Sequence, residues 1–84
     1  MSALRDVVEV VARALADHPD QVSVTETEHR QTTLVELYMA PGDLGRVIGR
    51  QGRTAQALRT LVGVVAEHDG KRAQLEFRDA QPAR

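Results

Sequence analysis

The chain has 84 residues, no cysteine, 42% hydrophobic residues and a formal net charge of −1. A chain of this length forms one small domain with little room for an enclosed active site, so we expect no enzymatic activity, small-molecule substrate or cofactor. The absence of cysteine excludes disulfides, thiolate catalysis and zinc–thiolate sites.

The first half of the chain predicts a helix followed by a β-hairpin. A helix is expected over about 3–17, because apolar residues recur there at helical spacing, and Pro19 ends it. This apolar stripe consists of Leu4, Val7, Val8, Val11 and Leu15. Alternating apolar and polar residues then predict strands near 21–27 and 32–39, which pair antiparallel across a polar turn at 28–31.

The second half predicts two helices and a last strand. A Pro-Gly pair breaks the second strand, and Asp43 is expected to cap a short helix over about 43–48. Apolar residues at helical spacing predict a longer helix over about 53–67, and alternation predicts a strand near 71–78.

The resulting order is helix, strand, strand, helix, helix, strand. This order predicts an α+β fold, with a three-stranded sheet and three helices packed on one of its faces. We expect a single domain over 1–80 and a frayed tail over 81–84.

Segment 47–54, with the sequence VIGRQGRT, joins the last two predicted helices through a G-x-x-G motif. Gly49 and Gly52 let the backbone turn sharply and approach another chain, and a helix that begins just afterwards presents N–H groups that favour phosphate. Positions 46–59 hold four arginines and no acidic residue, whereas positions 1–45 hold three arginines and eight acidic residues. A local basic patch on an acidic body predicts a nucleic-acid backbone laid across this loop.

The αββααβ order, with IGRQGR at 48–53 between the second and third helices, resembles a KH domain of the prokaryotic type II arrangement. The match covers nearly the whole chain, which is similar to the small stand-alone bacterial KH-domain proteins of the KhpA type. Its most specific part is the run DLGRVIGRQGRT at 43–54.

The resemblance implies binding of single-stranded RNA, with the loop clamping the backbone of about four nucleotides. It implies a role as an RNA chaperone or post-transcriptional regulator, alone or with a larger KH-containing partner of the Jag type. It also implies a link to cell shape and cell-wall homeostasis.

The residues expected to bind RNA surround the loop. The N–H groups of Arg50, Gln51 and Gly52 should face the phosphates, and the side chains of Arg50 and Arg53 should add charge-assisted contacts. The two apolar residues before the loop either form a floor for the bases or belong to the core, and at least one is expected in the core. The full predicted set is Arg46, Val47, Ile48, Gly49, Arg50, Gln51, Gly52 and Arg53.

Two residues outside the loop are further candidates. Gln74, near the last strand, is expected to read base edges, and Arg59 is either an RNA contact or an ordinary surface residue. Tyr38 and Phe77 are the only aromatic residues. They are too few for a stacking platform of the kind that many single-strand binders use, so the affinity of one domain should be low.

A second copy would compensate for low affinity. Leu61 and Val64 widen the apolar arc of the third helix beyond what one sheet would bury, and Gly63 permits close approach. We therefore expect a dimer contact centred on Leu61 and Val64. The alternative is that both residues pack beneath the last strand.

Two other classes remain open. The predicted helices at 43–48 and 53–67 could form a helix-turn-helix that reads duplex DNA, which a preference for single-stranded RNA would exclude. Alternatively, the basic loop could dock on an acidic protein, which a complete absence of nucleic-acid binding would support.

Catalytic, metal-binding and membrane functions are not indicated. His18, His29 and His68 are scattered near predicted turns, without catalytic partners or the spacing of metal ligands. No apolar run approaches the roughly 20 residues that span a bilayer, and charge appears too early for a signal peptide. We expect a cytoplasmic protein.

Overall fold

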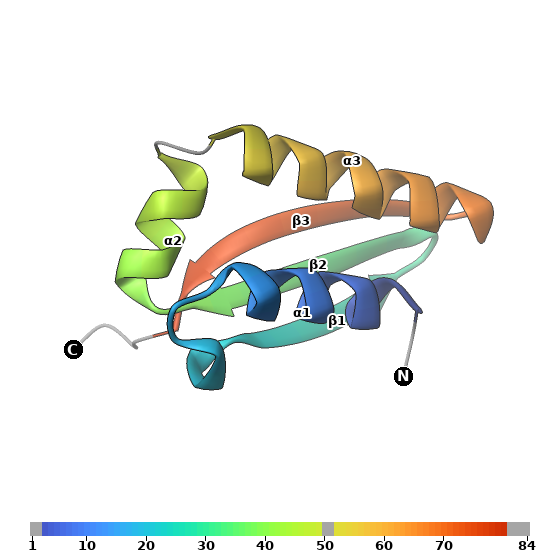
Figure 1. Ribbon diagram of the computed structural model, residues 1–84. Coiled ribbons are helices and arrows are strands. Elements are labelled where there is room, and N and C mark those ends of the chain that lie inside the picture. Colours follow the sequence, from blue (N-terminus) through green and yellow to red (C-terminus); the bar gives the residue numbers. More distant parts are fainter. Residues whose placement is uncertain (1–2, 50–51, 81–84) are drawn as a thin grey trace.

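The computed structural model describes residues 3–49 and 52–80, and its elements follow the predicted order (Figure 1). They are α1 (Ala3–Leu15), the 3₁₀ helix η1 (Pro19–Gln21), β1 (Ser23–His29), β2 (Thr32–Met39), α2 (Pro41–Ile48), α3 (Gly52–His68) and β3 (Arg72–Asp79). The expected α+β class is confirmed. The predicted tail lies outside the described residues, and none of the described helices is long and apolar enough to cross a membrane.

Strand β2 is the centre of the described sheet. It pairs antiparallel with β1, so that Val24 lies opposite Leu37, and parallel with β3, so that Val35 lies opposite Leu75. Side chains alternate between the two faces of a strand, and these four apolar side chains are all buried. Strand β3 is an edge strand of this sheet, and an edge strand leaves backbone N–H and C=O groups on one side without a strand partner.

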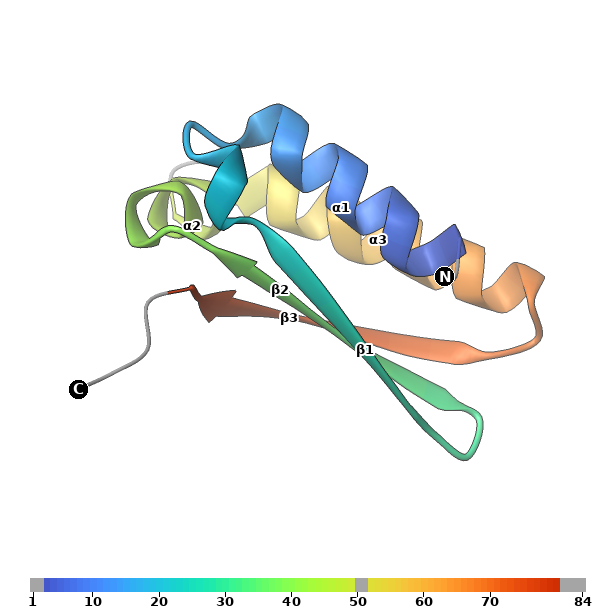
Figure 2. The same cartoon turned by 90° about the horizontal axis from the view of Figure 1, so that it is seen from below.

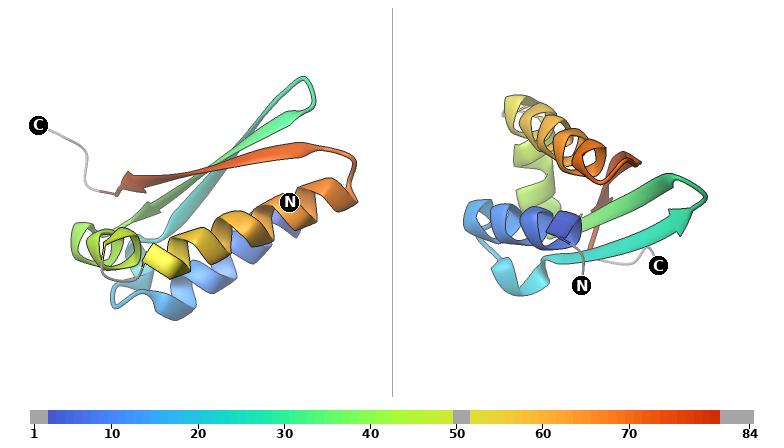
Figure 3. Two further views of the ribbon diagram at one scale, coloured as in Figure 1. Left: turned by 90° about the horizontal axis from the view of Figure 1, so that it is seen from above. Right: turned by 90° about the vertical axis from the view of Figure 1, so that its right-hand side faces the viewer.

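Helices α1 and α3 run side by side over one face of the sheet, and α2 crosses the end of that face (Figures 2 and 3). The core lies between the helices and this face of the sheet. Its largest fully buried side chains are those of Leu37, Met39, Val8, Val35, Val62 and Thr33. The sheet thus supports both α2 and α3, the two helices that flank the G-x-x-G motif.

Helix α1 is shorter than predicted because of a long-range contact. It ends at Leu15 rather than near position 17, and the N–H groups of Asp17 and His18 donate to the Asp43 carboxylate at 3.1 and 3.0 Å. The expected N-cap role of Asp43 is therefore wrong. Helix α2 begins at Pro41, a residue type that suits a first helical position, and Asp43 already lies within its first turn.

The strands agree with the alternation pattern to different degrees. Strand β2 spans Thr32–Met39, as predicted. Strand β1 begins and ends two residues later than the predicted 21–27. The reason is the 3₁₀ turn at Pro19–Gln21, in which the Val22 N–H donates to the Pro19 carbonyl at 3.1 Å.

The hairpin turn holds Arg30 in a conformation that suits glycine. Its φ is 60°, and it is the first of the two residues between β1 and β2. A positive φ at this position is typical of a type II′ turn, which favours glycine there.

Arg30→Gly should stabilise the domain by about 0.5–1 kcal/mol, because a left-handed conformation costs an L-residue about 1–2 kcal/mol and the entropy of glycine offsets part of the gain. Gly70 provides a control in which the substitution should change stability in the opposite direction. Its φ is 71°, so Gly70→Ala should destabilise the domain by about 1 kcal/mol. Urea midpoints measure both effects, and a midpoint that falls for Arg30→Gly would contradict the turn assignment.

Candidate nucleic-acid interface

The G-x-x-G motif connects α2, which ends at Ile48, to α3, which begins at Gly52. Arg50 and Gln51, which were predicted to bind phosphate, lie outside the described residues. Gly49 closes α2, with its N–H donating to the Gly45 carbonyl at 2.8 Å. A Cβ at Gly49 would lie 2.7 Å from that carbonyl oxygen, so the fold itself requires glycine at this position.

Gly52 differs from Gly49 because nothing lies within 4 Å of a Cβ built on it. Packing within the described residues therefore does not require glycine there. Its N–H donates to the Gly49 carbonyl at 3.1 Å. This N–H therefore closes the turn, and its predicted contact with a phosphate stays a prediction.

The first turn of α3 favours an anion. It contains no acidic residue, although acidic side chains stabilise the positive end of the helix dipole. Arg53 is exposed in this turn and has no ion-pair partner among the described residues. The helix dipole and this guanidinium together make the beginning of α3 a positive site.

The side chain of Arg46 extends towards α1. Its Nη1 lies 2.9 Å from Asp17 Oδ2, and its Nη2 donates to the Leu15 carbonyl at 3.0 Å. Nη2 also lies 3.6 Å from Asp43 Oδ1. Arg46 therefore fastens α2 to the end of α1, and an RNA contact by this side chain stays a prediction.

Asp43 is the charged group at the centre of this junction. Its side chain is buried, with 2% of the residue exposed. Burial raises the pKa of the carboxyl, but hydrogen bonds from the His18 and Asp17 N–H groups and from the His18 side chain lower it. The net result is a pKa below the ordinary value for aspartate. The carboxylate is thus held ionised where it positions the helix that leads into the loop.

The two apolar residues before the loop have separate roles. Val47 is 2% exposed and belongs to the core, so it is not available to a base. Ile48 is 49% exposed at the end of α2. Of the predicted apolar floor, the structure leaves only Ile48 accessible, directly beside the loop.

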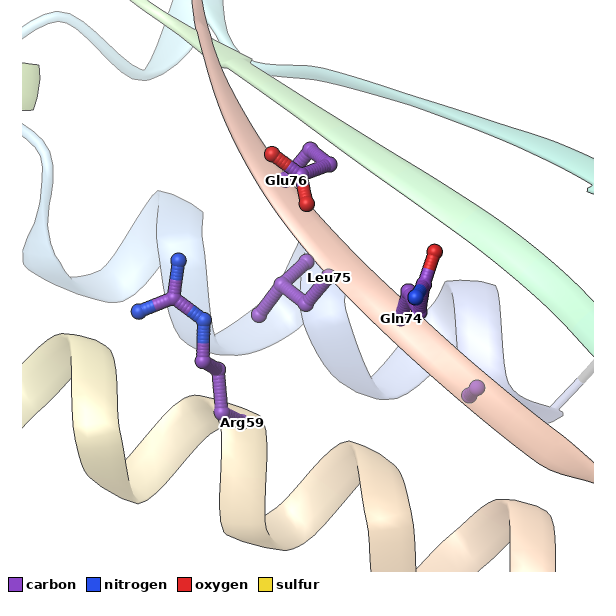
Figure 4. Close-up of a pocket in the computed structure, with 5 residues that line it drawn as sticks. Arg59, Gln74, Leu75 and Glu76 are labelled. Carbon is purple, nitrogen blue, oxygen red and sulfur yellow. The ribbon is translucent and has the colours of Figure 1, made fainter.

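Arg59 lies where α3 packs against β3. Its guanidinium carbon is 5.0 Å from the centroid of the Phe77 ring, within range of a cation–π contact. Phe77 is half-buried against the core. Arg59 and Gln74 line one pocket with Leu75 and Glu76 (Figure 4). Sequence reasoning missed Glu76 as a residue that borders this pocket, because the pocket exists only through the packing of α3 on β3.

The fold and the site together define the class. In the described residues, α2 and α3 lie over a mixed three-stranded sheet, and the G-x-x-G motif joins these two helices in the sequence. This is the arrangement of a type II KH domain. The family model described as "KhpA/KhpB, KH domain" matches residues 5–77.

Curated relatives agree with this match. A protein of Aquifex aeolicus named "RNA-binding protein KhpA" is 50% identical over 77 residues, which cover 92% of this chain and 98% of the relative. Proteins of the same name from Caldanaerobacter subterraneus and Leifsonia xyli are 48% and 46% identical, over 86% and 82% of this chain and 96% and 88% of their own lengths. The chain belongs to the KhpA/KhpB KH-domain family.

Proposed function

We propose that this protein binds single-stranded RNA in the cytoplasm by clamping the sugar-phosphate backbone at the connection between α2 and α3. The observation that carries the proposal is the beginning of α3. Its first turn has no acidic residue, Arg53 there has no ion-pair partner among the described residues, and a Cβ on Gly52 would meet open space. Relatives named for RNA binding, at up to 50% identity, support the same function.

The class of ligand is tested by fluorescence anisotropy with a mixed single-stranded RNA pool and a duplex DNA of equal length. We expect RNA to bind more tightly. Its affinity should fall about 20-fold between 50 and 200 mM salt if about three phosphates are contacted, because counterions are released. Tighter binding of duplex DNA would favour a helix-turn-helix, and binding of neither would favour a protein partner.

We further propose a homodimer that forms through the outer surface of the α1–α3 layer. On α3, Leu61 and Val64 remain 38% and 59% exposed, so they do not pack beneath the last strand. On α1, Val10 is 68% exposed and lines an apolar pocket with Val7 and Val11. Residues three apart share one side of a helix, so Leu61 and Val64 lie on one side of α3, and Val7 and Val10 lie on one side of α1. A two-fold dimer would bury these side chains and bring two RNA loops into one particle.

Val64→Asp should shift the protein from dimer to monomer, because a carboxylate placed in an apolar contact loses hydration without gaining a partner. Light scattering at tens of micromolar protein measures the mass. Gln56→Asp, which adds the same charge at an exposed polar site on α3, should leave the dimer intact. A native chain that is monomeric at this concentration would refute the dimer.

The wider role follows from the family resemblance and stays a prediction. It comprises RNA chaperone or post-transcriptional activity, work with a larger KH-containing protein, and the link to cell shape.

A further inference from the structure

The outer side of α1 carries an exposed apolar residue between two opposite charges. Val10 is 68% exposed, although valine has a lower helix propensity than the residues that best suit exposed helix positions. Asp6 lies four residues before it and Arg13 three residues after it, and residues at these spacings are neighbours on one side of a helix. These three side chains form the α1 stripe, which has a negative end, an apolar middle and a positive end.

Contacts within the chain leave both charges of the α1 stripe at the surface. Arg13 Nη2 lies 3.0 Å from Glu9 Oε2, and 54% of the Arg13 side chain is exposed. Asp6 Oδ1 lies 3.9 Å from Arg5 Nη1, and 46% of the Asp6 side chain is exposed. That contact is long, and Arg5 also donates to Glu9 and to the Val24 carbonyl, each at 3.2 Å. Both charged groups of the stripe are therefore accessible to a second molecule.

A hollow of about 310 Å³ lies beside the α1 stripe. It is lined by Asp6, Val7, Val10 and Val11, so its wall is apolar apart from one carboxylate. This lining suits an apolar side chain that has a cation close to it. The α1 stripe of a second copy offers that combination, because Val10 and Arg13 are neighbours on the helix surface.

The charges of two such stripes match only when the two helices lie antiparallel. A helix rises about 1.5 Å per residue, so Asp6 lies about 6 Å before Val10 and Arg13 about 4.5 Å after it. A two-fold axis beside Val10 therefore brings Arg13 of the second copy to within about 1.5 Å of the level of Asp6 along the helix. A parallel alignment would instead place like charges opposite each other, which an interface disfavours.

The helix dipole accounts for the signs of these charges but not for their position. Asp6 lies in the first turn of α1 and Arg13 in the last turn, where an acidic and a basic side chain each stabilise a helix. The dipole favours these residues on any side of the helix. It does not explain why both flank the exposed Val10, whereas a contact with a second copy does.

We propose that Asp6 and Arg13 form two symmetric ion pairs across a dimer in which the α1 helices of the two copies pack antiparallel. The proposal rests on the homodimer proposed above and adds its register. Helix α1 ends beside α2, where Arg46 donates to the Leu15 carbonyl, and α2 leads into the loop. Antiparallel packing of α1 therefore directs the two RNA loops to opposite ends of the particle.

Charge reversal tests the ion pairs. In its own dimer, Asp6→Arg places like charges opposite each other, and so does Arg13→Asp. Each variant should raise the dimer dissociation constant about tenfold in a light-scattering dilution series, because two attractive pairs become repulsive. An equimolar mixture of these variants should recover the native constant, because both pairs of the mixed dimer unite opposite charges. Asp20→Arg, which makes the same charge change in η1, should leave the native constant unchanged and should not rescue Arg13→Asp.

Single cysteines test the register, because the chain has no cysteine of its own. Val10→Cys should form an intermolecular disulfide under mild oxidation, since the two-fold axis passes beside this position. Ala14→Cys, which is exposed four residues further along α1, should not. An antiparallel register separates its two copies by about 12 Å along the helix, which is too far for a disulfide.

The outcomes separate the ion pairs from the dimer. A native chain that is monomeric would overturn both. A native dimer that both charge reversals leave intact, or a mixture that dimerises no better than its components, would overturn the ion pairs alone. Cross-linking through Ala14→Cys as efficient as that through Val10→Cys would show parallel helices and would overturn the register. Both positions are exposed, so the cysteine variants decide the register even if a charge reversal unfolds the chain.

Discussion

Gly52→Asp should abolish RNA binding and at the same time make the protein slightly more stable. A Cβ built at Gly52 meets no atom within 4 Å, so the fold leaves room for a side chain to begin there. An acidic residue in the first turn of α3 improves the helix dipole interaction, by about 0.3–1 kcal/mol. The same carboxylate would repel a phosphate at the loop by about 2–4 kcal/mol, or roughly 30- to 1,000-fold in affinity.

Gly42→Asp is the matched control. Gly42 also lies in the first turn of a helix, and a Cβ built on it meets no atom within 4 Å. It lies at the beginning of α2, whereas the loop follows the end of α2. Anisotropy with single-stranded RNA and thermal melts compare the two variants. If Gly52→Asp binds RNA as tightly as Gly42→Asp does, the phosphate does not approach the connection between α2 and α3.

Asp43→Ala should destabilise the domain by about 2–3 kcal/mol, which is a large share of the few kcal/mol that hold a domain of this size. The substitution removes the acceptor of the Asp17 and His18 N–H groups, and a hydrogen bond to a charged group is worth about 1.5–3 kcal/mol. Thermal melting should show a fall of about 10 °C or more. The melting temperature of Asp43→Asn should lie between those of the native protein and Asp43→Ala. An amide oxygen can accept from one of the Asp17 and His18 N–H groups, but the amide nitrogen is itself a donor and faces the other.

The pKa of Asp43 gives this prediction a pH dependence with a definite sign. The pKa is lower in the folded protein than in the unfolded chain, so the unfolded state binds the proton more readily. The contribution of Asp43 is therefore fully present above about pH 4 and is lost as the pH falls through the folded pKa. The difference in unfolding free energy between the native protein and Asp43→Ala should be constant near neutrality and should shrink in acid. A difference that stays constant down to pH 2 would show that the fold does not stabilise the Asp43 carboxylate.

The sequence was sufficient for features set by local periodicity. The strand at Thr32–Met39 follows from strict alternation, and the long helix follows from an apolar stripe that the sheet buries through Leu58 and Val62. The loop was predictable because two glycines and several arginines gather within a few positions. The class of fold follows from the order of these elements.

Contacts between distant segments were not predictable in the same way. Asp43 has the residue type of an N-cap, yet it accepts hydrogen bonds from residues 25 and 26 positions earlier. Arg46 looked like a free basic residue, but it is engaged by Asp17 and Leu15 at the end of α1. In both cases the partner is set by packing of α1 against α2, which no local pattern records.

The candidate site likewise combines features that the local sequence predicts with contacts that only tertiary packing creates. Gly49 and Gly52 are alike in sequence, but a Cβ is excluded by the fold only at Gly49. The guanidinium of Arg59 lies over the Phe77 ring only because α3 packs on β3. Sequence spacing predicts the loop that we propose as the phosphate site, whereas the contacts between α3 and β3 depend on tertiary structure.

A nuclear magnetic resonance titration of the ¹⁵N-labelled chain with a single-stranded RNA octamer shows where RNA is held. We expect the largest amide shifts at Gly49, Gly52 and Arg53, followed by the edge strand β3. The hairpin tip at Arg30 should not move. Shifts confined to the outer surface of α1 and α3 or to the uncovered face of the sheet, with Gly49, Gly52 and Arg53 unchanged, would show that RNA is not held between α2 and α3.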